Sequence, residues 1–247
     1  MTGRYTRYNQ MAKLFAILSG AFALKYFYAT ASVNELRWIL APTTLLVEIV
    51  SGRTFNFEMH AGYMSSDRSF LIASSCAGVN FMIAAFSMLS IAKLWRGKLS
   101  WKLIPAALLI SYAMTIVANT VRISTALHLQ NSRLDIAGLS GNQLHRLEGI
   151  LIYFGFLLLL FLLSERTLNQ TAAKPNGGPL RISEFILPLF VYYATTLGIP
   201  LANAIYRQEF AATTFLEHSV FVLLIPLLLI LPIALIELKN RNTSTLV

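Results

Sequence analysis

Long apolar stretches constrain this chain more than any other feature. A helix needs roughly 20 apolar residues to cross a hydrocarbon core of about 30 Å. Windows of this kind lie at residues 11–31, 77–95, 103–121, 147–164, 185–203 and 219–236. Hydrophobic residues make up 56% of the chain and charged residues only 13%, a composition typical of multispanning membrane proteins. The sequence therefore predicts an all-α fold: a polytopic helical membrane protein with about six transmembrane helices.

The chain is predicted to form one membrane domain over residues 1–247. Basic residues precede the first window, but no small-residue cleavage site follows it, so we expect a retained helix and not a removed signal peptide. The stretch "AAKPNGGP" at 172–179 has the composition of a flexible linker between the first four spans and the last two. No internal repeat is visible.

Residues 36–50, "LRWILAPTTLLVEIV", are apolar but short for a span, and they contain Pro42 and Glu48. A re-entrant or interfacial helix is the expectation. Loop charges point the same way, because short loops rich in Lys and Arg stay cytoplasmic. The N-terminus, residues 93–102, residues 164–181 and the tail are rich in these residues. If the first two of these segments share a side, residues 36–50 do not cross, and both termini are cytoplasmic.

The formal net charge of +9 raises the question of nucleic-acid binding. A polybasic nucleic-acid site would gather cations on one folded face, whereas these cations are spread over short connections between apolar segments. Their distribution indicates membrane topology and contact with anionic lipid. Nucleic acid is therefore excluded as a partner, and the lipid bilayer is the expected surrounding.

The segment 51–75, predicted to lie outside, alternates apolar and polar residues. Phe55, Phe57 and Met59 alternate with Asn56 and Glu58, and this period of two predicts a short hairpin. We place its turns at Gly62 and from Ser65 to Asp67.

The chain has a single cysteine, Cys76, in "SSCAGVNFM". One cysteine excludes an internal disulfide and a four-cysteine metal site. Ser74 or Ser75 is expected to cap a helix beginning near Cys76, and a helix N-terminus would favour the thiolate. The alternative is that Cys76 is a small packing residue. The residue type alone leaves both interpretations open.

Two further reactive residues are predicted on the outer face with Cys76. Arg122 lies just beyond the outer end of the third span, and His145 lies just before the fourth. Asn119 precedes Arg122 by three residues, so both project from one helical face. The alternative for Arg122 is an interfacial anchor whose charge snorkels to water. Three other histidines leave the choice of base open: His60, His128 and His218.

Other charged residues receive weaker assignments. Lys25, in the first span, is expected to snorkel to the outer interface. Glu48 and Glu148 are candidates for orienting a catalytic partner, with surface solvation as the default.

Three motifs together resemble a known family. "SSCAGVNF" with Cys76, "ANTVR" with Arg122 and "HRLEG" with His145 are similar to the motifs of the exosortase and archaeosortase membrane enzymes, most closely exosortase K. The resemblance implies a cysteine endopeptidase or transpeptidase that cleaves C-terminal, PEP-CTERM-like sorting signals of exported proteins. It assigns Cys76 as nucleophile, His145 as acid and base, and Arg122 as the group that holds the oxyanion, with Asn119 as possible support.

The resemblance also implies the setting of the enzyme. The protein is expected in the prokaryotic cytoplasmic (inner) membrane, with the active site on the outer face. Its partners would be membrane-anchored substrate proteins, and no cofactor or metal is expected. The rival hypothesis is a noncatalytic scaffold or transporter subunit, although a transporter should place polar groups near the bilayer middle. A membrane acyltransferase is a second rival that would leave Cys76 without a role.

Overall fold

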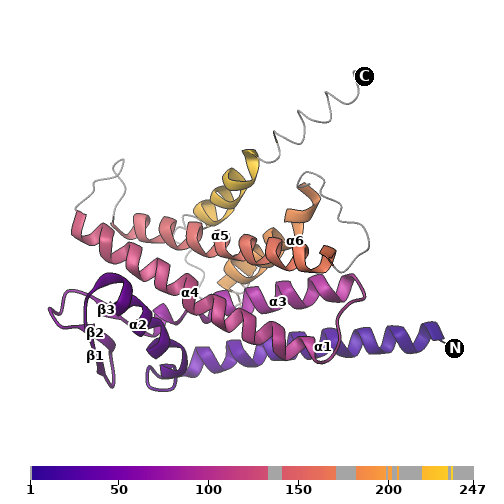
Figure 1. Cartoon of the computed structure of the whole chain (residues 1–247), viewed down its shortest axis with the longest axis horizontal. Helices are drawn as coiled ribbons and strands as arrows, with labels where there is room; N and C mark the ends of the chain where they lie inside the picture. Colours follow the sequence, from indigo (N-terminus) through magenta and orange to yellow (C-terminus); the bar gives the residue numbers. More distant parts are fainter. Residues whose placement is uncertain are drawn as a thin grey trace. The chain divides into compact units, whose positions relative to one another are not determined.

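A computed structural model of the chain describes residues 2–132, 141–170, 182–198, 200–201, 205, 219–232 and 235 (Figure 1). The chain divides into two compact units, residues 1–152 and residues 153–247. The two units are described separately below.

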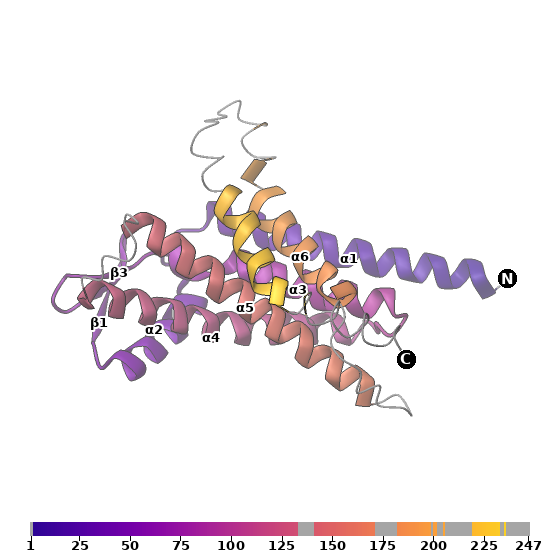
Figure 2. The same cartoon turned by 90° about the horizontal axis from the view of Figure 1, so that it is seen from above.

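The first unit is built on helices. They are α1 (Thr2–Thr30), α2 (Arg37–Ser51), α3 (Val79–Trp95), α4 (Leu103–Ser132) and the part of α5 (Gly141–Gln170) up to residue 152. Helix α3 packs against both α1 and α4, and α2 packs against α4 (Figures 1 and 2). Because α3 lies between two helices, most of its side chains are buried, as its apolar composition requires.

Helix α2 is a short amphipathic helix that packs against α4. Its buried face carries Ile39, Leu40, Thr43, Thr44 and Val47. Pro42 has no N–H to donate to the Trp38 carbonyl, one turn earlier. The Tyr112 hydroxyl of α4 donates to that carbonyl instead, at 2.8 Å, and its ring stacks on Trp38. The proline that interrupts α2 thus gives α4 an attachment point.

A small antiparallel sheet follows α2. Strands β1 (Phe55–Glu58) and β2 (Gly62–Ser65) pair in register from Phe55 opposite Ser65 to Glu58 opposite Gly62, and β3 (Leu71–Ile72) pairs with β2. The turn expected at Gly62 lies just before it, at residues 59–61, because Gly62 itself begins β2. The sheet has three strands, whereas the alternation in the sequence predicted two.

Hydrogen bonds tie α1 to the rest of the first unit at two separate levels. Toward its N-terminus, Lys13 Nζ donates to the Leu99 carbonyl at 2.7 Å, and Asn9 accepts from Trp101 Nε1. Toward its C-terminus, Lys25 and Tyr28 contact the segment around Cys76. We call the first level, around residues 93–102, the Lys98 end, and the second, around residues 74–80, the Cys76 end.

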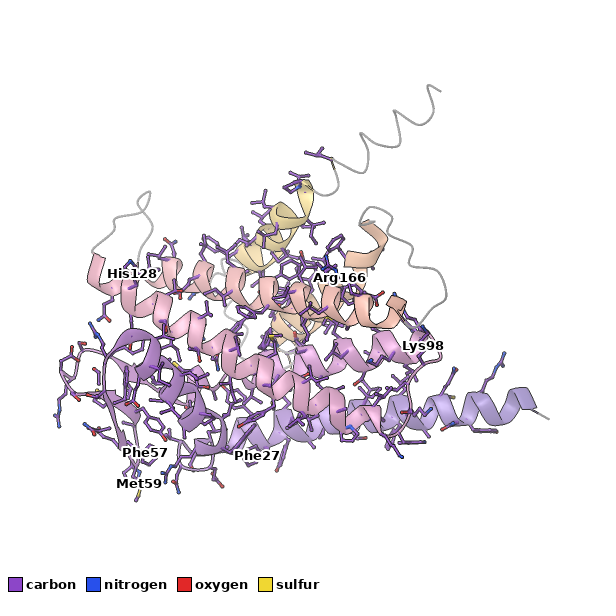
Figure 3. The ribbon with its side chains drawn as sticks, viewed as in Figure 1. Phe27, Phe57, Met59, Lys98, His128 and Arg166 are labelled. Carbon is purple, nitrogen blue, oxygen red and sulfur yellow. The ribbon has the colours of Figure 1, made fainter. Side chains whose placement is uncertain are left out.

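The length of α3 separates these two ends. Seventeen helical residues rise by about 25 Å. In Figure 3, Lys98 lies at one end of the first unit, and Phe57, Met59 and His128 lie at the other. The N-terminal part of α1 and the 93–102 loop therefore share one end, and the sheet belongs to the opposite end.

The second unit holds the rest of α5 and two shorter apolar helices. Helix α6 (Ile182–Tyr193) continues into the π-helical turn η2 (Ala194–Gly198), and a further helix covers residues 219–232. The Tyr193 hydroxyl donates to the Leu223 carbonyl at 2.9 Å, which joins the two.

Four of the described helices are long and apolar enough to cross a membrane: Arg7–Thr30, Ser74–Trp95, Leu103–Gln130 and Arg146–Arg166. Phe185–Gly198 and Ser219–Pro232 are shorter, and residues next to both lie outside the described part of the chain. The chain is thus a helical membrane protein, and the six spans remain a prediction. The linker predicted at 172–179 also lies outside the described residues.

Two helices extend beyond the predicted spans. Helix α4 continues to Ser132, and α5 begins at Gly141, so Arg122 and His145 lie within helices. The reason is that an apolar window ends where polar residues begin, whereas helical hydrogen bonding continues through polar residues. "RISTALHLQNS" contains neither glycine nor proline to stop it.

Candidate active site at the Cys76 end

Cys76 lies in a short turn that leads into α3. The turn is the 3₁₀ helix η1 (Ser74–Ala77), within which the Cys76 N–H donates to the Ala73 carbonyl at 2.9 Å. Cys76 is half-buried and is a free thiol. Gly78 follows in the left-handed conformation, with φ of 67°, and α3 begins at Val79.

The predicted capping of this helix by Ser74 or Ser75 is wrong. The residue before η1 is Ala73, the residue before α3 is Gly78, and neither end has a side-chain cap. The left-handed Gly78 separates the cysteine from the α3 terminus. The thiol therefore needs a source of activation other than a capped helix N-terminus.

Asn119 of α4 holds the cysteine turn from the adjacent helix. Its side chain is fully buried, and its Nδ2 donates to the Cys76 carbonyl at 2.9 Å. A Cβ atom at Gly78 would lie 2.7 Å from Asn119 Oδ1. Position 78 is therefore restricted to glycine both by its positive φ and by the approach of Asn119. Asn119 supports Cys76 through the backbone.

A buried polar stripe along α4 leads to Asn119. Ser111, Thr115 and Asn119 follow one another at four-residue spacing and are fully buried. The hydroxyls of Ser111 and Thr115 donate to carbonyls one turn earlier in their own helix, at 2.8 and 2.6 Å. Such back-bonding satisfies a hydroxyl inside an apolar bundle. The Asn119 amide instead leaves its helix to bind the cysteine turn.

Arg122 lies nearly one turn beyond Asn119 and reaches α5. Its side chain is half-buried. A Cβ atom at Gly149 would lie 3.3 Å from Arg122 Nε, so a glycine of α5 faces the guanidinium at close range. His145 lies on α5 four residues before Gly149, which places the two positions on one helix face. The His145 side chain lies outside the described residues.

The structure thus links Cys76, Asn119 and Arg122, and it brings the α5 segment that carries His145 to Arg122. Two of the other histidines are exposed: His60 lies in the turn before β2, and His128 lies on α4. His218 lies outside the described residues.

Glu148 is a residue that the sequence interpretation assigned wrongly to the surface. Only 5% of it is exposed, and it precedes the glycine that faces Arg122. The available signal was its place in "HRLEG", where a carboxylate enters an apolar helix. Glu48, by contrast, accepts a hydrogen bond from the Phe55 N–H at 2.7 Å, so it fixes the start of β1.

Helix α1 contributes two polar side chains to the Cys76 end. Lys25 Nζ donates to Asn80 Oδ1 at 2.8 Å, just after the cysteine turn. The Tyr28 hydroxyl donates to the Ser74 carbonyl at 3.4 Å, and it lies within electrostatic range of both Cys76 and Arg122. The sequence analysis assigned no role to Tyr28. Its signal was a lysine and a tyrosine three residues apart near the C-terminus of α1.

The residue types at this end suit nucleophilic catalysis. Within the described ranges, no group of three His, Cys, Asp or Glu side chains is placed to hold a metal ion. A thiol, a guanidinium and an imidazole position together form a set suited to nucleophilic attack on a carbonyl.

Comparison with known proteins gives one match. The sequence profile described as transmembrane exosortase (Exosortase_EpsH) matches residues 10–163. This range contains all three motifs, with Cys76, Arg122 and His145. No curated protein matches the chain, and no solved structure matches it.

Proposed function

The chain belongs to the transmembrane exosortase family, and from this premise we propose that it is a membrane cysteine endopeptidase or transpeptidase that cleaves C-terminal, PEP-CTERM-like sorting signals of exported proteins. Family membership supports a membrane transpeptidase or protease role in general. The choice of substrate and of catalytic residues is our proposal. Among the family's branches, the motifs resemble exosortase K most.

One observation carries the proposal. The Cys76 carbonyl is held by Asn119, and Arg122, on the next turn of α4, lies against α5 at Gly149, one turn from the His145 position. Three motifs that are far apart in the sequence therefore meet at one end of one unit. A packing role for Cys76 does not require a buried amide to hold its backbone or an arginine nearby.

In the proposed reaction, the Cys76 thiolate attacks the scissile carbonyl carbon and its π electrons move to the oxygen. Arg122 donates hydrogen bonds to this oxyanion. When the C–N bond breaks, protonated His145 gives its proton to the leaving amine, and a thioester remains on Cys76. Water or an acceptor amine then attacks the thioester and loses a proton to His145, and the thiolate leaves.

The proposed setting follows from the charges of the loops. With six spans and both termini in the cytoplasm, the Lys98 end would lie on the cytoplasmic side of a prokaryotic inner membrane. The Cys76 end, with the sheet, would lie on the outer side. A sorting signal consists of a recognition motif, a transmembrane helix and a basic cluster. A substrate with this arrangement presents its scissile bond at the outer surface, at the level of Cys76.

The direct test is cleavage of a co-produced membrane protein that carries a C-terminal sorting signal. We expect Cys76→Ala to abolish cleavage and Cys76→Ser to be nearly as inactive, because a serine hydroxyl is not ionised in a site built for a thiol. His128→Ala serves as the control, since His128 is exposed on α4 and lies outside the three motifs. Full cleavage by Cys76→Ala at normal membrane levels would return the chain to the scaffold or transporter hypothesis.

A further inference from the structure

We propose that Tyr28 of α1 is a positioning residue for the Cys76 thiolate, whose hydroxyl hydrogen bond shifts from the Ser74 carbonyl to the ionised sulfur. This inference rests on the proposed function for its biological meaning. Its test, described below, depends only on the reactivity of the thiol.

The first support is the location of Tyr28. It lies near the C-terminus of α1 and is half-buried in the apolar cluster that also receives Cys76. Its hydroxyl contacts the carbonyl of Ser74, two residues before the cysteine in the same four-residue turn. Tyr28 is therefore the side chain of α1 that reaches the cysteine turn itself, whereas Lys25 contacts Asn80 in α3.

The second support is the geometry of the hydrogen bond. A distance of 3.4 Å lies beyond the usual 2.5–3.0 Å for a hydroxyl donor and an oxygen acceptor, so the bond to the Ser74 carbonyl is weak. Giving up a weak neutral bond costs little. A bond from the same hydroxyl to a thiolate is charge-assisted and stronger. Ionisation of Cys76 thus favours reorientation of the phenol.

The third support is the charge environment of the turn. Lys25 approaches from α1, Arg122 approaches from α4, and the α5 segment that meets Arg122 carries His145 and the buried Glu148. The face that α2 buries carries no titratable side chain. Since no side-chain cap stabilises this turn, a neutral donor from α1 would add to the stabilisation that these cations give the thiolate.

The experiment uses the purified full-length protein in detergent and follows alkylation of Cys76 by iodoacetamide across pH. Because Cys76 is the chain's single cysteine, the rate reports this thiol alone. Tyr28→Phe removes only the hydroxyl. The matched control is Tyr26→Phe, on the same helix, because Tyr26 is 65% exposed and stacks on Phe22 away from the turn.

We expect Tyr28→Phe to move the pH midpoint of alkylation upward, so that the rate below the midpoint falls about ten- to hundredfold, as the loss of one hydrogen bond to a charged group predicts. Tyr26→Phe should alkylate like the wild type. Tyr28→Met, which also lacks the hydroxyl, must show the same shift and replaces Tyr28→Phe if that variant does not fold. In cleavage, Tyr28→Phe should lower kcat with little change in KM.

An unchanged midpoint in the Tyr28 variants would overturn the inference, and so would an equal shift in Tyr26→Phe. These outcomes are separate from the fate of the proposed function. If the wild type cleaves no sorting signal, the proteolytic function fails while the alkylation result still decides the role of Tyr28.

Discussion

The two ends of the first unit use hydrogen bonds in different ways. At the Lys98 end, α1 is joined to the 93–102 loop by Lys13 and by Trp101, and both bonds are simple attachments of a helix to a loop. At the Cys76 end, side chains of α1 and α4 converge on a single four-residue turn. An attachment tolerates substitution, whereas a turn held from two helices has one geometry. The comparison shows that the geometry of the backbone is more constrained at the Cys76 end.

The largest expected effect tests whether the two ends face opposite sides of a membrane. In a Cys76→Ala background, Met59→Cys and Lys98→Cys place one thiol at each end, both at exposed positions. We expect a membrane-impermeant maleimide applied to intact cells to label Met59→Cys fully and Lys98→Cys only after permeabilisation. The reverse pattern would invert the topology, and equal labelling of both would disprove opposite sides.

The next effect separates the histidine at the Cys76 site from the histidines around it. His145→Ala should lower the cleavage rate about 10²- to 10⁴-fold, the range expected for loss of a general acid and base. His60→Ala and His128→Ala should cleave like the wild type. Rates are compared at equal amounts of membrane protein. A severe loss in His128→Ala with a mild loss in His145→Ala would reverse the assignment.

Arg122→Lys separates a directed donor from a simple interfacial charge. Lysine keeps the positive charge but loses the planar fork of donors. If Arg122 holds the oxyanion, kcat should fall about 10²-fold, near the cost of losing one oxyanion donor. The Arg166→Lys variant, near the end of the Arg146–Arg166 helix, controls for a general effect of arginine replacement. Near-normal kcat in Arg122→Lys would make Arg122 an anchor.

The smallest effect compares two glycines with the same backbone conformation. Gly78 and Gly97 both have φ of 67°, but a Cβ at Gly97 meets nothing within 4 Å, whereas one at Gly78 collides with Asn119. Gly97→Ala should lower the free energy of unfolding by only about 1 kcal/mol, which is the energy of placing alanine in the left-handed conformation. Gly78→Ala should lower the thermal midpoint further and reduce cleavage at least tenfold, because the Cys76 carbonyl loses its donor.

Equal thermal midpoints for the two alanine variants would show that the Asn119 side chain moves aside at little energetic cost. The two ends would then differ less in rigidity than their hydrogen bonds indicate.

Sequence periodicity predicted the helices of the first unit well, because burial in a bilayer or a bundle depends on apolar length. The window at 77–95 corresponds to α3, and residues 36–50 form α2 almost to the residue. Apolar length does not predict where a helix stops inside a polar stretch, and this is why α4 and α5 extend beyond the expected ends. The third strand was missed for a similar reason: β3 has only two residues, too few for an alternation to show.

The candidate site could be proposed from the sequence, but its contacts could not. Residue type alone left the role of Cys76 and the choice of histidine open, and the resemblance of three motifs selected Cys76, Arg122 and His145 as candidates. The roles of Asn119 and Tyr28 depend on which backbone carbonyl each side chain meets, and that follows from helix packing across dozens of residues. The sequence shows a glycine at position 78 but does not show that its backbone is left-handed. Glu148 was assigned to the surface because the charge of a residue does not show whether its side chain is buried.

The short helix α2 has a consequence for how deep the reactive thiol lies. One face of α2 packs against α4 and the cysteine turn, while Leu45, Ile49 and Val50 are exposed on the other. At 15 residues, α2 spans about 22 Å, less than a hydrocarbon core, so these side chains favour the boundary between headgroups and acyl chains. A helix held at this boundary fixes the height of Cys76 relative to the membrane surface. Under the proposed function, bilayers of different thickness would move α2 and Cys76 together, so a substrate would be cut at a height set by the membrane surface and not by its midplane.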